Sequence, residues 1–212
     1  PVFPCRLRTS SAAKRGVPII TFNPLRERGL ERFLNPQNPI EMVFGGTTIS
    51  TQYHQLKTGG DIATIVGICK AVLEADDAAR TSGSERVVDP GFIAEHTLGF
   101  VEFAAFCQAQ TWKDLEVRSG LTEAAIREAA AIYMQSHAVM INYGMGVTQH
   151  VHGVECVKMM VNLLLLRGNI GKPGAGILPI RGHSNVQGQR TVGITEKTKL
   201  APLDKLKEVY GF

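Results

Sequence analysis

The stretch AVMINYGMGVTQHVHG, residues 138–153, indicates the fold class of this chain. Residues 138–144 form a short, mostly apolar run that ends at a glycine, which is typical of a buried parallel strand. Beyond the loop, apolar residues recur at helical spacing from about Val154 to Arg167, and Gly168 ends the helix. A strand, a glycine-containing loop and a helix in this order predict one βα unit of an α/β fold.

The segments that precede this unit continue the alternation. Residues 17–22 predict a second buried strand, and residues 41–56 predict a loop followed by a short strand. A helix is predicted from Asp61 onward, followed by two short helices separated at Gly99. The most strongly marked helix covers 121–136, because Thr122 can cap it and its interior is rich in alanine.

The segments that follow the unit contain fewer signals. Residues 169–179 predict a glycine- and proline-rich loop with a short extended piece, and residues 181–195 predict a polar loop. Residues 200–211 predict a short terminal helix. Taken together, we expect an α/β fold with a mostly parallel sheet flanked by helices.

Composition limits the classes of partner. The chain has 212 residues, of which 44% are hydrophobic and 20% charged, as in an ordinary globular protein. Its 23 Lys and Arg are interleaved with 19 Asp and Glu, so a net charge of +4 predicts no nucleic-acid partner. No stretch approaches the ~20 apolar residues that a membrane span needs. We therefore expect no membrane segment in this chain.

The four cysteines do not form a metal-binding pattern. They are scattered along the chain without a CxxC pair, which predicts small buried side chains rather than a zinc or iron–sulfur site. His150 and His152 lack the spacing of two ligands on one helix face. We therefore expect no metal ligand within this chain.

Three places are candidates for binding. Gly144 and Gly146 follow a predicted strand and would let backbone N–H groups approach a pyrophosphate, although on their own they more often mark a plain structural turn. Asp61 could accept from a guanine or a ribose hydroxyl, or could only cap its helix. The segment PIRGHSNVQGQR, residues 179–190, is either a solvent-facing loop or the lining of a site for an anion.

Three motifs between Asn142 and Ile194 carry a family resemblance. They are G-M-G-x-T-Q at 144–149, L-x-x-G-N-I-G-x-P at 165–173 and R-G-x-x-N-V-Q-G at 181–188. In this order and spacing they resemble the molybdopterin-dependent oxidoreductases, in particular the formate-dehydrogenase-like alpha subunits. The resemblance extends over roughly residues 13–195. It implies a Rossmann-like dinucleotide-binding domain of a larger multidomain enzyme.

The resemblance also implies a cofactor and its binding residues. The cofactor is bis-molybdopterin guanine dinucleotide with molybdenum or tungsten, and a 4Fe-4S cluster would lie outside this chain. Arg181 and His183 would be catalytic, with Arg181 orienting a substrate anion. The residues implied to hold the cofactor are Asn23, Pro24, Gly60, Asp61, Gly144, Met145, Gly146, Thr148, Gln149, Gly182, Asn185, Val186, Gln187 and Gly188.

The expected function follows from the resemblance. The chain would be part of an enzyme that oxidises or reduces formate or a similar small molecule by two electrons. An electron-acceptor protein would be a possible partner, and the enzyme would lie in the cytoplasm. Residues 1–180 would form the dinucleotide-binding domain and residues 181–212 the start of an adjoining cofactor-binding domain. The family's metal ligand would lie upstream of the matched region.

Two alternatives stay open at this point. One is a non-catalytic, nucleotide-binding type of fragment that lacks the metal ligand. The other is a nicotinamide-dependent Rossmann dehydrogenase, which predicts an acidic residue ~20 residues beyond the glycine turn. Residues 160–169, which lie at that distance, contain no acid.

Overall fold

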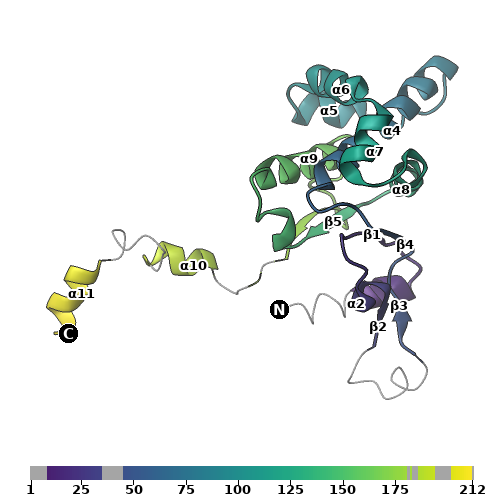
Figure 1. Ribbon diagram of the computed structural model, residues 1–212. Helices are drawn as coiled ribbons and strands as arrows, with labels where there is room; N and C mark the ends of the chain where they lie inside the picture. The colour runs from purple at the N-terminus through teal and green to yellow at the C-terminus, as the bar shows by residue number, and fades with distance from the viewer. Residues whose placement is uncertain (1–8, 35–44, 181, 183–185, 194–201, 212) are drawn as a thin grey trace. The chain divides into compact units, whose positions relative to one another are not determined.

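The structure is a computed structural model that describes residues 9–34, 45–180, 182, 186–193 and 202–211 (Figure 1). The chain divides into two compact units, which are described separately. The larger unit lies within residues 2–180 and the smaller unit within residues 181–212. Among the described residues, no helix is both long enough and apolar enough to cross a bilayer.

The larger unit contains two parallel strand pairs. Strand β1 (Ile20–Phe22) pairs with β4 (Gln52–His54), and β5 (Met140–Tyr143) pairs with β6 (Gly176–Pro179). An antiparallel pair joins the two-residue strands β2 (Arg32–Phe33) and β3 (Thr47–Thr48). The α/β class with mostly parallel pairing is confirmed. The described strands pair two by two rather than in one wide sheet.

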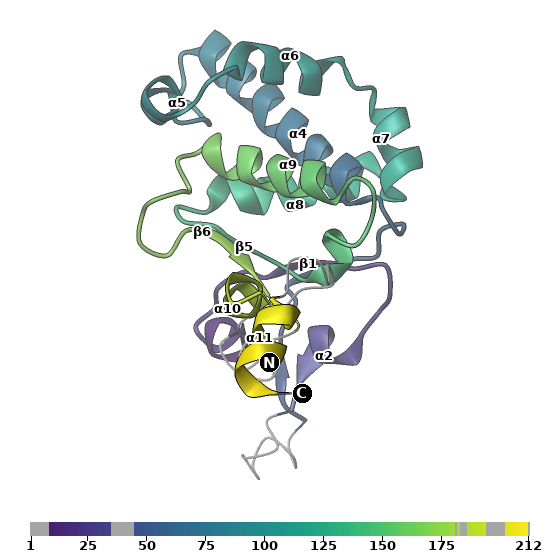
Figure 2. The same cartoon turned by 90° about the vertical axis from the view of Figure 1, so that its left-hand side faces the viewer.

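Helix α4 (Asp61–Ser82) is the centre of the larger unit. Every residue from Ala63 to Leu73 is buried, because four helices that follow in the chain pack against α4. Helices α8 (Glu123–Gln135) and α9 (Gly153–Leu165) lie between α4 and the β5–β6 pair in both views (Figures 1 and 2). Apolar side chains of β5 and β6, such as Ile141 and Ile177, complete this core.

Three short helices follow α4 along the chain. They are α5 (Pro90–His96), α6 (Phe100–Ala109) and α7 (Trp112–Ser119). The predicted break at Gly99 is confirmed, and this glycine has a left-handed φ of 74°. Helix α7 was not predicted, although Thr111 caps its start and a left-handed Gly120 ends it.

Two expectations for the helices are wrong. Asp61 does not cap α4 with its side chain, because the helix already begins at Gly60, whose carbonyl accepts from the N–H of Thr64 at 3.0 Å. The smaller unit contains α10 (Val186–Thr191) within the segment predicted to be a polar loop. The predicted terminal helix is confirmed as α11 (Leu203–Tyr210). Helix α2 (Arg28–Glu31) is a single turn after β1.

Candidate functional site

The carboxyl ends of β5 and β6 lie side by side in the larger unit. Tyr143 is opposite Pro179, and the N–H of Ile180 donates to the carbonyl of Tyr143 at 2.7 Å. The loop 144–152 therefore starts at the strand edge where parallel α/β folds bind ligands. This loop contains five of the residues implied by the resemblance.

Gly144 and Gly146 are exposed, and the fold itself does not require a glycine at either position. Neither has a left-handed φ, and a Cβ atom added to either would meet no atom within 4 Å. Gly153, at the other end of the same loop, differs. A Cβ there would lie 2.7 Å from the carbonyl oxygen of Thr148, so packing excludes a side chain. The open space at Gly144 and Gly146 would let another group come close to the backbone.

The loop forms a compact turn around one carbonyl. The N–H groups of Thr148 and Gln149 both donate to the carbonyl of Met145 at 3.0 Å, and the Thr148 hydroxyl donates to the same oxygen at 3.1 Å. Residues 145–147 form the 3-10 turn η1, and the first N–H groups of such a turn have no acceptor inside it. Met145 is 48% exposed, and the side chain of Gln149 is exposed as well. The first backbone N–H groups of the turn therefore have no acceptor within it.

Gly60 and Asp61 follow β4 at the start of α4. A Cβ on Gly60 would lie 2.8 Å from the carbonyl oxygen of Ser119, so this glycine is explained by packing against α7. Asp61 is half-buried, and its side chain makes no capping bond. Burial, and to a lesser extent the negative charge of Asp61, raise the pKa of the Cys156 thiol on α9 to about 12. Asp61 therefore lies close to the first turn of α9, near the loop 144–152.

Asn23 and Pro24 follow β1 and form an ordered turn. The N–H of Asn23 donates to the carbonyl of His54 at 3.2 Å, which extends the pairing of β1 with β4. Its side-chain amide donates to the carbonyl of Leu25 at 2.6 Å, and the hydroxyl of Tyr53 donates to the same carbonyl at 2.6 Å. The amide of Asn23 is therefore engaged in holding the turn.

The third motif, residues 181–188, lies in the smaller unit. Arg181, His183 and Asn185 lie outside the described residues. Gly182 is described as a bend, and Val186, Gln187 and Gly188 form the first half of α10. These residues belong to the smaller unit, whereas the loop 144–152 belongs to the larger unit.

The second motif has a structural explanation. Asn169 is 1% exposed, and its side-chain oxygen accepts from the N–H of Val139 at 3.1 Å, one residue before β5. Arg167 donates to the carbonyls of Val87, Tyr133 and Ser136 at 2.9, 2.6 and 2.8 Å. These bonds connect the end of α9 to α8, to the loop after α4 and to the start of β5. Sequence reasoning missed this role because no local pattern shows which distant groups a buried Asn will meet.

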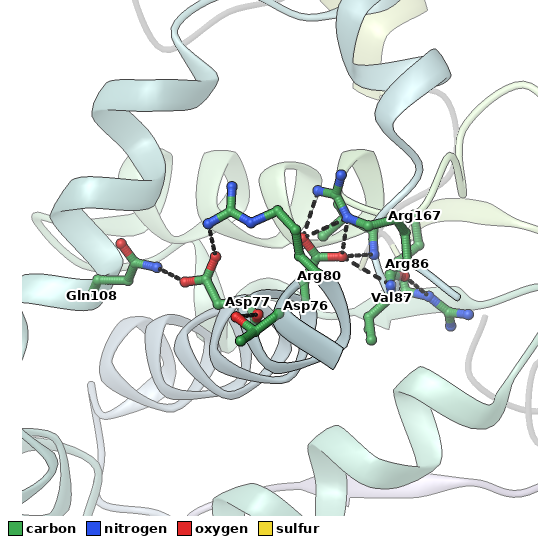
Figure 3. Close-up of polar contacts among 9 residues, drawn as sticks. Asp76, Asp77, Arg80, Arg86, Val87, Gln108 and Arg167 are labelled. Carbon is green, nitrogen blue, oxygen red and sulfur yellow. Dashed lines mark hydrogen bonds and ion pairs between the residues drawn. The ribbon is translucent and has the colours of Figure 1, made fainter. Parts of the chain in front are cut away.

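The same region contains an ion pair between the buried Asp76 and the exposed Arg86 (Figure 3). The carboxylate of Asp76 on α4 accepts from the Arg86 guanidinium at 2.6–3.1 Å and from the N–H groups of Val87 and Val88 at 2.9 and 3.2 Å. Burial alone would raise the pKa of Asp76, but these donors together lower it below its usual value. The carbonyl of Val87, which accepts from Arg167 at 2.9 Å, links this network to the end of α9.

The described part of the chain contains no group of three His, Cys, Asp or Glu residues arranged to hold a metal ion. Cys69, Cys107 and Cys156 are free and buried, as the sequence predicted, and Cys5 lies outside the described residues. Burial and a hydrogen bond with Cys107 raise the pKa of the Cys69 thiol well above its usual value. These three thiols are therefore part of the core.

Comparison with known proteins places this α/β domain in a family. The model of the molybdopterin oxidoreductase family matches residues 19–209, so the chain belongs to that family. Protein YdeP of Escherichia coli strain K12 is 50% identical over 210 residues, covering 98% of this chain and 28% of YdeP. Formate dehydrogenase H of the same strain is 35% identical over 150 residues, covering 71% of this chain and 20% of that enzyme.

A solved structure agrees with this assignment. Acetylene hydratase from Pelobacter acetylenicus matches with a TM-score of 0.60 at 17% identity, over 77% of this chain and 19% of that chain. At this identity the likeness supports the fold alone. The chain spans about a quarter of the length of YdeP.

Proposed function

We propose that the larger unit holds one arm of bis-molybdopterin guanine dinucleotide at the carboxyl end of β5. The observation that carries the proposal is the pair of exposed glycines, Gly144 and Gly146, which neither conformation nor internal packing requires. Close approach of a bulky ligand to the backbone would explain why neither position carries a side chain. The N–H groups at the start of η1 suit a diphosphate, because a helical turn presents unpaired donors at its amino end.

The remaining residues are assigned by the resemblance. We propose that Met145, Thr148 and Gln149 line the same arm, while Asn23, Pro24, Gly60 and Asp61 lie near a guanosine. The half-buried carboxylate of Asp61, which makes no capping bond, suits the amino groups of a guanine. Gly60 contributes indirectly, since its missing side chain lets α4 begin against α7.

Residues of the third motif are proposed to lie at the metal end. These are Gly182, Asn185, Val186, Gln187 and Gly188, together with Arg181 and His183 as catalytic residues. The guanidinium of Arg181 is a planar cation that can hold a carboxylate through two hydrogen bonds, which suits formate or a similar anion. Residues 181–212 would then begin an adjoining cofactor-binding domain, and residues 1–180 would form the dinucleotide-binding domain.

The activity proposed for the whole protein is a two-electron oxidation or reduction of a small molecule. The cofactor, when bound with molybdenum or tungsten, supplies the redox chemistry, and the chain positions the cofactor and the substrate. Formate is the proposed substrate class because formate dehydrogenase H is among the relatives. An electron-acceptor protein, a 4Fe-4S cluster outside this chain and a cytoplasmic location are part of the same proposal.

The test uses the full-length protein that contains this chain. Pterin and metal are measured per polypeptide in the unchanged protein, in Gly146→Val and in Gly91→Val. Gly91 is a matched control, because it is also exposed, has no left-handed φ and would place a Cβ 3.6 Å from its nearest neighbour. We expect two pterins with molybdenum or tungsten in the unchanged protein and in Gly91→Val, and a clear loss in Gly146→Val.

The cofactor content of these proteins distinguishes a cofactor-binding enzyme from a non-catalytic protein. Full-length protein that is soluble but contains neither pterin nor metal would support a non-catalytic protein instead. Equal cofactor content in Gly146→Val and Gly91→Val would remove the loop 144–152 from the site. A further variant, Arg181→Ala, is expected to keep the cofactor and lose turnover, and unchanged turnover would show that Arg181 does not hold the substrate.

A further inference from the structure

His150 lies in the bend between η1 and α9. Its Nδ1 atom accepts a hydrogen bond from the backbone N–H of His152 at 3.2 Å. An imidazole nitrogen that accepts carries no proton, so the neutral ring has its proton on Nε2. The ring is therefore arranged to donate a hydrogen bond from Nε2.

The Nε2 atom is covered by protein but has no hydrogen-bond partner among the described residues. Within that part of the chain it is the one side-chain nitrogen or oxygen in this situation. A covered donor without an acceptor costs stability, and nearly all such groups in folded proteins are paired. The structure thus leaves one donor without the acceptor that a bound ligand would supply.

The surroundings of His150 point to that acceptor. The N–H of Gly153 donates to the carbonyl of His150 at 3.0 Å, which holds the bend against the first turn of α9. The same loop contains Gly144 and Gly146 with their open space. No side chain caps the start of α9. The backbone N–H groups at this end of the helix therefore favour a nearby anion.

We propose that His150 donates a hydrogen bond from Nε2 to a phosphate oxygen of the dinucleotide that the loop 144–152 holds. Since Nε2 is covered in this structure, the bend shifts on binding so that the nitrogen meets its acceptor. This inference rests on the proposed function and adds one binding residue to the same site. The proposal gives the neutral His150 ring a role as hydrogen-bond donor, which a bend that only connects η1 to α9 would not need.

The test compares three variants of the full-length protein. His150→Phe keeps a ring of similar size without a donor, and His150→Gln places an amide nitrogen near the position of Nε2. His152→Phe is the matched control, because the side chain of His152 is exposed and only its backbone N–H joins the network. Pterin release from loaded protein is followed by fluorescence, and thermal unfolding is followed in protein from cells grown without molybdate or tungstate.

We expect His150→Phe to release the pterin about tenfold faster than the unchanged protein, since it loses one hydrogen bond to a charged group. Its cofactor-free form should unfold at about the same temperature, because the substitution removes both the unpaired donor on Nε2 and the Nδ1 acceptor of the His152 N–H. His150→Gln and His152→Phe should release the pterin at about the unchanged rate.

Two results would overturn the inference and leave the proposed function standing. One is an unchanged release rate in His150→Phe. The other is a lower unfolding temperature of cofactor-free His150→Phe with no change in release, which would show a purely structural ring. Absence of pterin from the unchanged protein would instead overturn the proposed function, and this inference with it.

Discussion

The buried side chain of Asn169 allows a local prediction of stability. Its oxygen is the acceptor for the N–H of Val139, and its nitrogen lies 3.5 Å from the hydroxyl of Tyr133. Asn169→Ala removes the acceptor at a position where 1% of the residue is exposed, so water does not easily replace it. The start of β5 should then open more readily.

The size of this effect follows from the bond that is lost. Leaving a buried backbone donor unpaired costs about 1–3 kcal/mol. A central value of about 2 kcal/mol corresponds to a roughly 30-fold increase in the local opening equilibrium. Amide hydrogen exchange across residues 139–143 in the full-length protein should speed up by this factor.

The control for this experiment is Asn142→Ala. Asn142 lies on β5 itself but is exposed, so its substitution should change exchange by little. If Asn169→Ala left exchange across 139–143 within about twofold of the unchanged protein, the bond to Val139 would not hold the strand. The structural explanation of the second motif would then be refuted.

Three further predictions concern the same unit. Gly60→Ala should destabilise it by about 1–3 kcal/mol in urea unfolding, since the new Cβ meets a carbonyl oxygen of α7 at 2.8 Å, whereas Gly91→Ala should be nearly neutral. Asp76 has a lowered pKa in the folded state, so its stabilisation is present above the ordinary carboxyl pKa and is lost as the pH falls below it. Acid unfolding should therefore depend less steeply on pH in Asp76→Asn, and an unchanged slope would exclude this source. Thr122→Ala removes the cap bond to the N–H of Ala125 at 3.2 Å and should cost about 1 kcal/mol, which equal urea midpoints would contradict.

The sequence predicted the elements that have both a pattern and an end signal. Helix α8 begins after Thr122 as expected, because its hydroxyl accepts from the N–H of Ala125. Helix α7 has equally clear ends in Thr111 and Gly120, and these signals could have revealed it. Helix α10 could not be foreseen in this way, since its six residues include a glycine and lie in a polar segment.

The candidate site was predictable only in part. The spacing of Gly144 and Gly146 after a strand suggested a ligand, but the sequence could not distinguish them from Gly60 or Gly153. The structure makes this distinction, because packing excludes a Cβ at the latter two and leaves space at the first two. The covered nitrogen of His150 was equally hidden, since it depends on how the loop folds back onto α9.

The residues on either side of β5 differ in how tightly they are packed and hydrogen-bonded within the domain. Before the strand, Val139 is tied to Asn169, a buried residue whose partners all belong to the domain. After the strand, Gly144 and Gly146 contribute little to internal packing. If the loop 144–149 holds the proposed cofactor, substitutions there should change ligand affinity more than folding stability, so relatives can diverge in specificity while the scaffold stays the same.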